Sequence, residues 1–122
     1  MSAADRSRLR ELTFEIERFY YDEAALIEAG DHQGWAKLLA DDIRYAMPQT
    51  EFLDRRVNRD LDFIGAHSFD EDKRSIMNRI AWLAVRPTPE VPPPKRRMLV
   101  TNVRVLREVE DGVDACSAFL PW

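Results

Sequence analysis

Cysteine, histidine and glycine are scarce in this chain of 122 residues, and the scarcity excludes several kinds of site. Cys116 is the only cysteine, so an intrachain disulfide cannot form, and the chain suits a reducing compartment. An iron–sulfur cluster held by two cysteines and two histidines cannot be built either. A structural zinc site is disfavoured because it needs four good ligands at suitable spacing. The four glycines form no phosphate-binding loop and no nucleophile elbow.

Long apolar runs are also missing. No run approaches the roughly 20 residues that span a bilayer, and the N-terminus has no signal-peptide pattern. The net charge of −4 gives no reason to expect a nucleic-acid partner. With 45% hydrophobic and 33% charged residues, the composition predicts one soluble, cytoplasmic domain over residues 1–122.

The first third of the chain has the pattern of two helices. Apolar residues at helical spacing predict a long helix over residues 5–29. Gly30 suits the left-handed residue that often follows a helix end. Asp31 is then predicted to cap a second, short helix over residues 32–40.

Another helix start is predicted near the middle of the chain. Ser68 and Glu71 have the spacing of a capping box. The first turn would contain three carboxylates, Asp70, Glu71 and Asp72, where the helix dipole favours negative charge. Behind them, apolar residues recur at helical spacing: Ile76, Ile80 and Leu83. A capped helix is favoured over a metal site, because neighbouring carboxylates on one turn point in different directions.

Alternating residues predict three strands, over residues 43–47, 98–107 and 113–120. One face of the second strand is expected to hold Leu99, Thr101, Val103 and Val105. An Asp-Gly pair at residues 111–112 favours a tight hairpin between the last two strands. The order helix, helix, strand, helix and hairpin predicts an α+β fold with helices packed on a curved sheet.

Two segments are predicted to be irregular. Residues 49–67 are polar and long for a loop in a small domain, which is typical of a binding loop or of a solvated excursion, and both alternatives stay open. Residues 86–94 hold five of the seven prolines. This segment is expected to be an extended connector rather than a proline-recognition motif.

Four stretches together resemble the small (beta) subunits of bacterial aromatic-ring-hydroxylating dioxygenases. They are residues 16–24, 35–48, 67–73 and 97–105. The resemblance implies a cone-shaped fold of the nuclear-transport-factor and cystatin-like type, with a strongly curved, mostly antiparallel sheet around the helices. Family members continue past the position of Phe119 with further strands. The strand over residues 113–120 is therefore expected to present an unpaired edge.

The resemblance also implies a function. Members of this family are non-catalytic structural subunits and carry no cofactor of their own. They assemble with large (alpha) subunits that hold a Rieske [2Fe–2S] cluster and a mononuclear iron, commonly three of each subunit, so other beta subunits are partners too. The assembly would cis-dihydroxylate an aromatic ring, using dioxygen and electrons from a reduced nicotinamide cofactor.

Two sets of residues are candidates for a site. Oligomeric interfaces commonly bury aromatic and arginine anchors, so the candidate interface residues are Arg55, Arg56, Trp82 and Arg97. The alternative is a free-standing isomerase or dehydratase of the same cone fold, or a small-molecule-binding protein. An acid or base in its apolar pocket would come from His67, Asp42 and Tyr45. Their plainer interpretations are a loop-to-helix boundary residue, a solvated helix end and a core aromatic.

Overall fold

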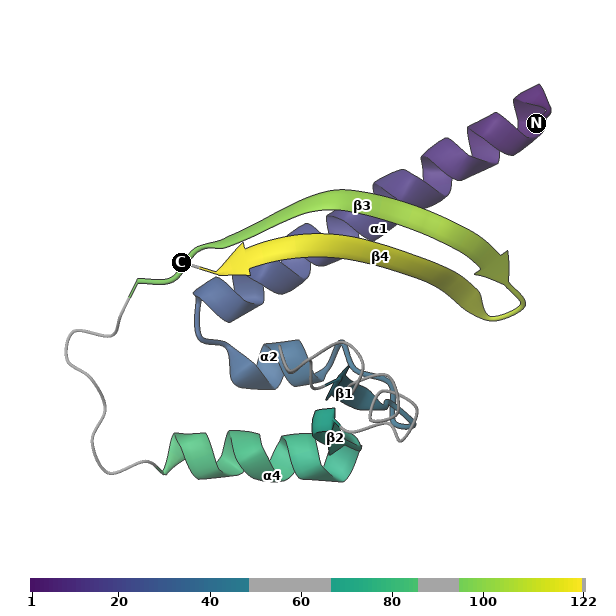
Figure 1. Ribbon diagram of the computed structural model, residues 1–122. Helices are drawn as coiled ribbons and strands as arrows, with labels where there is room; N and C mark the ends of the chain where they lie inside the picture. Colours follow the sequence, from purple (N-terminus) through teal and green to yellow (C-terminus); the bar gives the residue numbers. More distant parts are fainter. Residues whose placement is uncertain (49–66, 86–94, 122) are drawn as a thin grey trace, which may run out of the picture. The chain divides into compact units, whose positions relative to one another are not determined.

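The computed structural model describes residues 1–48, 67–85 and 95–121 (Figure 1). The chain divides into two compact units, Met1–Leu38 with Thr88–Trp122, and Leu39–Pro87. Each unit has its own two-stranded antiparallel sheet, β3–β4 in the first and β1–β2 in the second. The mixture of helices and antiparallel strands agrees with the predicted α+β class, whereas the single domain over residues 1–122 stays a prediction.

Helix α1 (Ala3–Glu28) is the long element of the first unit. Ser2 and Asp5 form a capping box at its start. The Ser2 hydroxyl accepts a hydrogen bond from the Asp5 backbone N–H at 3.0 Å, and the Asp5 carboxylate accepts one from the Ser2 N–H at 3.1 Å. Gly30 has a φ of +69° just beyond the helix end. The predicted long helix and the left-handed glycine after it are both confirmed.

Helix α2 (His32–Ala36) follows after a short break. As predicted, Asp31 caps it, and its carboxylate accepts a hydrogen bond from the backbone N–H three residues on at 2.8 Å. The helix is shorter than the predicted span of residues 32–40. Beyond Ala36 the chain tightens, because the Leu38 N–H donates to the Trp35 carbonyl only three residues back.

The hairpin of the first unit consists of β3 (Met98–Val109) and β4 (Gly112–Pro121). Val109 pairs with Gly112, so the turn between the strands has two residues, and the predicted hairpin is confirmed. β3 lies against α1 (Figure 1). The buried side chains of this unit belong to the helices: Leu12, Ala24 and Ala36.

Asn102 interrupts β3 with a left-handed φ of +55°. Thr101 pairs with Ala118 and Arg104 pairs with Cys116, so two residues of β3 face one residue of β4. This is the pattern of a β-bulge, and it shifts the alternation of side chains by one position. The less exposed residues of this part of β3 are Met98, Val100, Val103 and Val105.

The bulge overturns part of the predicted face of this strand. Leu99 and Thr101 were expected to share a face with Val103 and Val105, but both are exposed. The prediction is wrong for these two residues because strict alternation does not allow for an extra residue at Asn102.

The second unit contains the ribbon of β1 (Tyr45–Pro48) and β2 (His67–Glu71) and helix α4 (Lys73–Ala84). Two side chains of α4 are buried, Ile76 and Ile80. The predicted strand over residues 43–47 overlaps β1 and is confirmed with a later start. The polar segment 49–67, apart from its last residue, and the proline-rich segment 86–94 lie outside the described residues.

The predicted start of the helix in the second unit is wrong. Ser68 and its neighbours through Glu71 form β2 and pair with β1 instead of opening a helix. Asp72 is the cap, and its carboxylate accepts a hydrogen bond from the Ser75 backbone N–H at 2.9 Å. Local sequence supports a cap at either position, and the cross-strand pairing of the preceding residues decides between them.

Candidate interaction surface

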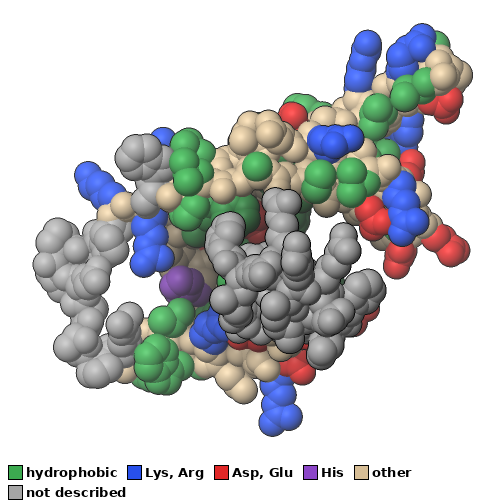
Figure 2. Space-filling model, in the orientation of Figure 1, with side chains coloured by type: hydrophobic (Ala, Val, Ile, Leu, Met, Phe, Trp, Pro, Cys, Tyr) green, Lys and Arg blue, Asp and Glu red, His purple; other side chains and the backbone are tan. Residues whose placement is uncertain are grey.

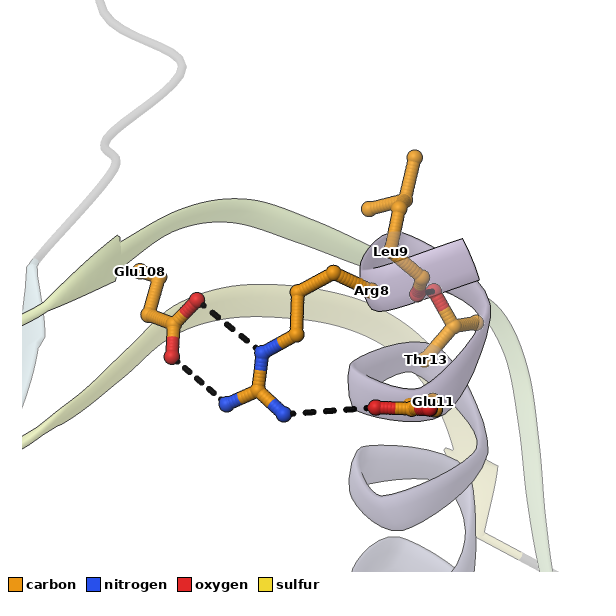
Figure 3. A network of polar contacts seen from close by, with 5 residues as sticks. All are labelled: Arg8, Leu9, Glu11, Thr13 and Glu108. Atoms are coloured by element: carbon orange, nitrogen blue, oxygen red, sulfur yellow. Dashed lines mark hydrogen bonds and ion pairs between the residues drawn. The ribbon is translucent and has the colours of Figure 1, made fainter. Parts of the chain in front are cut away.

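Arg8 connects α1 to the far end of β3. Its guanidinium donates to both carboxylate oxygens of Glu108, from Nε at 3.3 Å and from Nη2 at 2.7 Å (Figure 3). It also lies 3.4 Å from Glu11 on the same helix. Hydrogen bonding from Arg8 holds the pKa of the Glu108 carboxyl below its ordinary value, and Glu108 in turn raises the pKa of Arg8. These exposed contacts position the hairpin on α1.

Arg97, one of the predicted interface residues, lies where β3 meets the end of α1. The Met98 backbone N–H donates to Glu28 Oε1 at 2.8 Å, and Arg97 Nη1 lies 3.5 Å from Glu28 Oε2. The Arg97 side chain remains 78% exposed. Glu28 therefore fixes the start of β3 while the guanidinium of Arg97 stays accessible to a partner.

Trp82, another predicted interface residue, is exposed on α4. Its exposed fraction is 61%, and Val85 at the helix end is 76% exposed. At 3.6 residues per turn, both lie on the side of α4 opposite Ile76 and Ile80, which are buried. Figure 2 shows hydrophobic side chains gathered at this end of α4. Arg55 and Arg56, the other two predicted interface residues, lie outside the described residues.

The three alternative catalytic residues all belong to the second unit. Asp42 is exposed in the turn before β1, and Tyr45, the first residue of β1, is 39% exposed. Tyr45 pairs with Glu71, and His67 pairs with Pro48. Tyr45 and His67 therefore occupy opposite ends of the β1–β2 ribbon, and their backbone positions do not converge on one point.

The acidic residues predicted for the first helical turn have separate roles. Asp70 binds Arg44, the residue just before β1, through two hydrogen bonds, at 2.8 and 3.1 Å, which raise the pKa of Arg44. Glu71 pairs with Arg79 of α4. Asp72 caps α4, and the hydrogen bond from Ser75 lowers its pKa. In the described parts of the chain, no three His, Cys, Asp or Glu residues are grouped so as to hold a metal ion.

The hairpin presents an apolar surface that the sequence analysis did not predict. Four of its large hydrophobic residues are more than half exposed: Leu99, Leu106, Phe119 and Leu120. Leu99 and Leu120 are directly paired across the strands. The exposure of Leu99 follows from the bulge at Asn102, for which the strand pattern alone contains no signal.

Comparison with known proteins gives the family. The sequence model of the family described as "Ring hydroxylating beta subunit" matches residues 22–121, which is most of the chain. The chain belongs to this family. The match covers both units, and it confirms the resemblance found in the sequence.

Individual relatives agree with the family match. A benzene 1,2-dioxygenase subunit beta of Pseudomonas putida is 34% identical over an alignment of 125 positions. The alignment covers 92% of this chain and 62% of the relative. A chlorobenzene dioxygenase subunit beta of a Cupriavidus species is 34% identical with the same coverage. A biphenyl 2,3-dioxygenase subunit beta of Rhodococcus jostii is 32% identical and covers 83% of this chain and 56% of that relative.

The chain thus spans about three fifths of the length of these relatives. Among the described residues, no helix is both long enough and apolar enough to cross a membrane.

Proposed function

We propose that this chain is the structural, non-catalytic beta subunit of an aromatic-ring-hydroxylating dioxygenase. The family match over residues 22–121 carries the proposal. The names of the relatives, beta subunits of benzene, chlorobenzene and biphenyl dioxygenases, support an aromatic compound as the substrate of the whole assembly. The reaction would be cis-dihydroxylation of the ring, with dioxygen and electrons from a reduced nicotinamide cofactor.

The redox groups of such an assembly belong in its large (alpha) subunit. A Rieske cluster needs two cysteines and two histidines, and this chain has one cysteine, so its residues do not fit the cluster. We therefore place the cluster and the mononuclear iron in the alpha subunit and assign no step of the reaction to residues of this chain. Three subunits of each kind, with contacts between beta subunits, complete the proposed assembly.

The proposed fold of the assembled subunit is the cone of the nuclear-transport-factor type. The antiparallel hairpin β3–β4 lying against α1 supports it, since helices packed on an antiparallel sheet are the basic layer of that architecture.

Trp82 and Arg97 are the proposed contacts with other subunits, together with Arg55 and Arg56. Trp82 is 61% exposed and the Arg97 side chain 78% exposed, and both residue types are enriched at the energetic centres of interfaces. Neither residue is buried in its own unit, because more than half of each side chain is exposed.

Co-expression with the ring-hydroxylating large subunit of the same organism tests the proposed assembly. A tag on the large subunit, followed by light scattering and iron analysis, measures composition and cofactor content. We expect the chain to co-purify in a mixed complex, with iron present only when the large subunit is present. A folded chain that stays apart from the large subunit would contradict the proposal.

Replacing Trp82 tests one of the proposed contact residues by itself. Trp82→Ala is expected to weaken binding of the large subunit by about 30-fold, the effect of removing a typical tryptophan hot spot. Phe14→Ala is the matched control, because Phe14 is 68% exposed on α1 and is not a proposed contact. Equal losses in the two variants, or no loss in either, would remove Trp82 from the interface.

A further inference from the structure

Two groups of exposed, oppositely charged residues lie at the two ends of β3. Lys95, Arg96 and Arg97 directly precede the strand and are called the basic end. Glu110 and Asp111 form the turn that follows the strand and are called the acidic turn. Figure 1 shows the start of β3 and this turn at opposite ends of the hairpin.

The basic end is only partly neutralised by its surroundings. Glu28 lies beside it at the end of α1, with Oε2 3.5 Å from Arg97 Nη1. In the described parts of the chain, Lys95 and Arg96 form no ion pair. The last turn of α1 contains no basic residue, and the negative end of the helix dipole adds about half a charge. Glu28 and the helix end therefore balance about half of the three positive charges.

The acidic turn also keeps its charge. Two arginines lie at this end of β3, and both are already paired with other carboxylates, Arg8 with Glu108 and Arg107 with Asp114. Among the residues that the structure describes, neither acid of the turn forms an ion pair. The turn therefore presents two carboxylates that no cation of the described chain neutralises.

The two groups are too far apart to neutralise each other within one copy. β3 has 12 residues, and at about 3.3 Å per residue its ends lie about 35 Å apart. At physiological salt, charges are screened over about 8 Å. A second copy of the chain, by contrast, can place its acidic turn directly beside the basic end of the first.

We propose that the basic end of one copy binds the acidic turn of the next copy, in a head-to-tail contact between beta subunits. The inference rests on the proposed function, in which three beta subunits belong to one assembly. A ring of three identical subunits needs a contact that joins two different surfaces of the chain. The basic end and the acidic turn are two such surfaces, and their charges are complementary.

The charge of the whole chain favours this partner over a polyanion. The total net charge is −4, and the basic end contributes +3 to it, so the other residues together carry −7. Such a chain is repelled by a nucleic acid or an anionic membrane. A second copy of the chain supplies the carboxylates locally, at one turn.

Sedimentation of the full-length chain alone, at several salt concentrations, tests the contact. We expect a trimer that dissociates as salt rises, because exposed charges are screened. Lys95→Glu with Arg96→Glu should lower the association constant about tenfold or more, and so should Glu110→Lys with Asp111→Lys. The variant with all four substitutions has opposite charges again, so its association constant should return to within about threefold of wild type.

Arg10→Glu with Lys37→Glu is the matched control, because it makes the same change of charge at exposed residues of the same unit. Circular dichroism verifies that every variant stays folded. An equal loss of association in the control would indicate net charge instead of a specific contact and would overturn the proposal. A folded four-substitution variant that does not recover would also overturn it, as would a wild-type chain that stays monomeric or stops at a dimer.

Co-purification with the large subunit is measured separately for the same variants. Its loss in the wild type would contradict the proposed function. A chain that binds the large subunit but fails the charge-exchange test contradicts only the head-to-tail contact, so the two failures are distinguishable.

Discussion

Arg8 and Glu108, 100 residues apart in the sequence, are joined by two hydrogen bonds that connect the first turns of α1 to the end of β3 (Figure 3). This is the longest-range side-chain link among the described residues of the first unit. The paired groups are exposed, so salt screens them and their contribution to stability is modest. Their titration nevertheless gives a direct test of the contact.

Glu108→Gln should remove a pH-dependent part of the stability. The Glu108 pKa is lowered in the folded chain from an ordinary value of 4.5, so the unfolded chain binds more protons in the acid range. The stabilisation is therefore fully present above pH 4.5 and is lost as the pH falls through the folded pKa. We expect wild type to melt above the variant at pH 7, with the difference shrinking below pH 4.5 and at high salt.

Thermal melts at pH 7 and across the acid range measure this difference. Glu110→Gln is the control, because Glu110 is a neighbouring exposed carboxylate in the turn after β3. A Glu108 variant whose melting temperature follows that of the Glu110 variant at every pH would show that Arg8 does not hold Glu108 in solution.

The element order apart from β2 could be predicted from sequence because it depends on local signals. The helical spacing in residues 5–29, the left-handed Gly30 and the turn of the last hairpin are all read from a few neighbouring residues, and all three are confirmed. Such signals act within one or two turns of chain, where propensity and capping dominate.

The wrong predictions concern features that depend on distant partners. The pairing of β2 with β1 moved the cap of α4 from Ser68 to Asp72, and the bulge at Asn102 reversed part of one strand face. The contact of Arg8 with Glu108 was missed for the same reason. Contact residues such as Trp82 were predicted from residue type alone. The structure adds that the Trp82 side chain is exposed, as a contact residue must be in the free chain.

Asn102 should tolerate glycine and reject valine. A left-handed φ costs an ordinary L-residue about 1–2 kcal/mol, more so when the side chain is β-branched, while glycine adopts it freely. We expect Asn102→Val to lower the free energy of unfolding by about this amount and Asn102→Gly to leave it unchanged or raise it slightly. Ala118→Val is the control at an exposed strand position outside the bulge, and urea denaturation measures all three. A valine variant as stable as wild type would refute the left-handed bulge.

Replacing Asp72 and Ser68 in turn should distinguish the observed helix cap from the predicted one. Asp72→Ala removes the acceptor of the Ser75 N–H and is expected to lower the melting temperature and the helix content. Because Ser68 lies in β2 and not at the helix start, Ser68→Ala is expected to have the smaller effect. Circular dichroism on heating measures both. If the serine variant loses more helix than the aspartate variant, the helix begins at Ser68 after all.

The alternative of a catalytic site in this chain makes a sharp kinetic prediction. Loss of a general acid or base lowers a rate by about 10²–10⁴-fold. Because the β1–β2 ribbon keeps Tyr45 and His67 at opposite ends and Asp42 is exposed, we expect no such loss. In the assembled dioxygenase, Asp42→Asn, Tyr45→Phe and His67→Ala should each leave turnover of the aromatic substrate within about threefold of wild type. Gel filtration confirms that each variant still assembles, which separates a catalytic loss from an assembly defect. A hundredfold loss in an intact complex would make that residue catalytic and would end the assignment of a purely structural role.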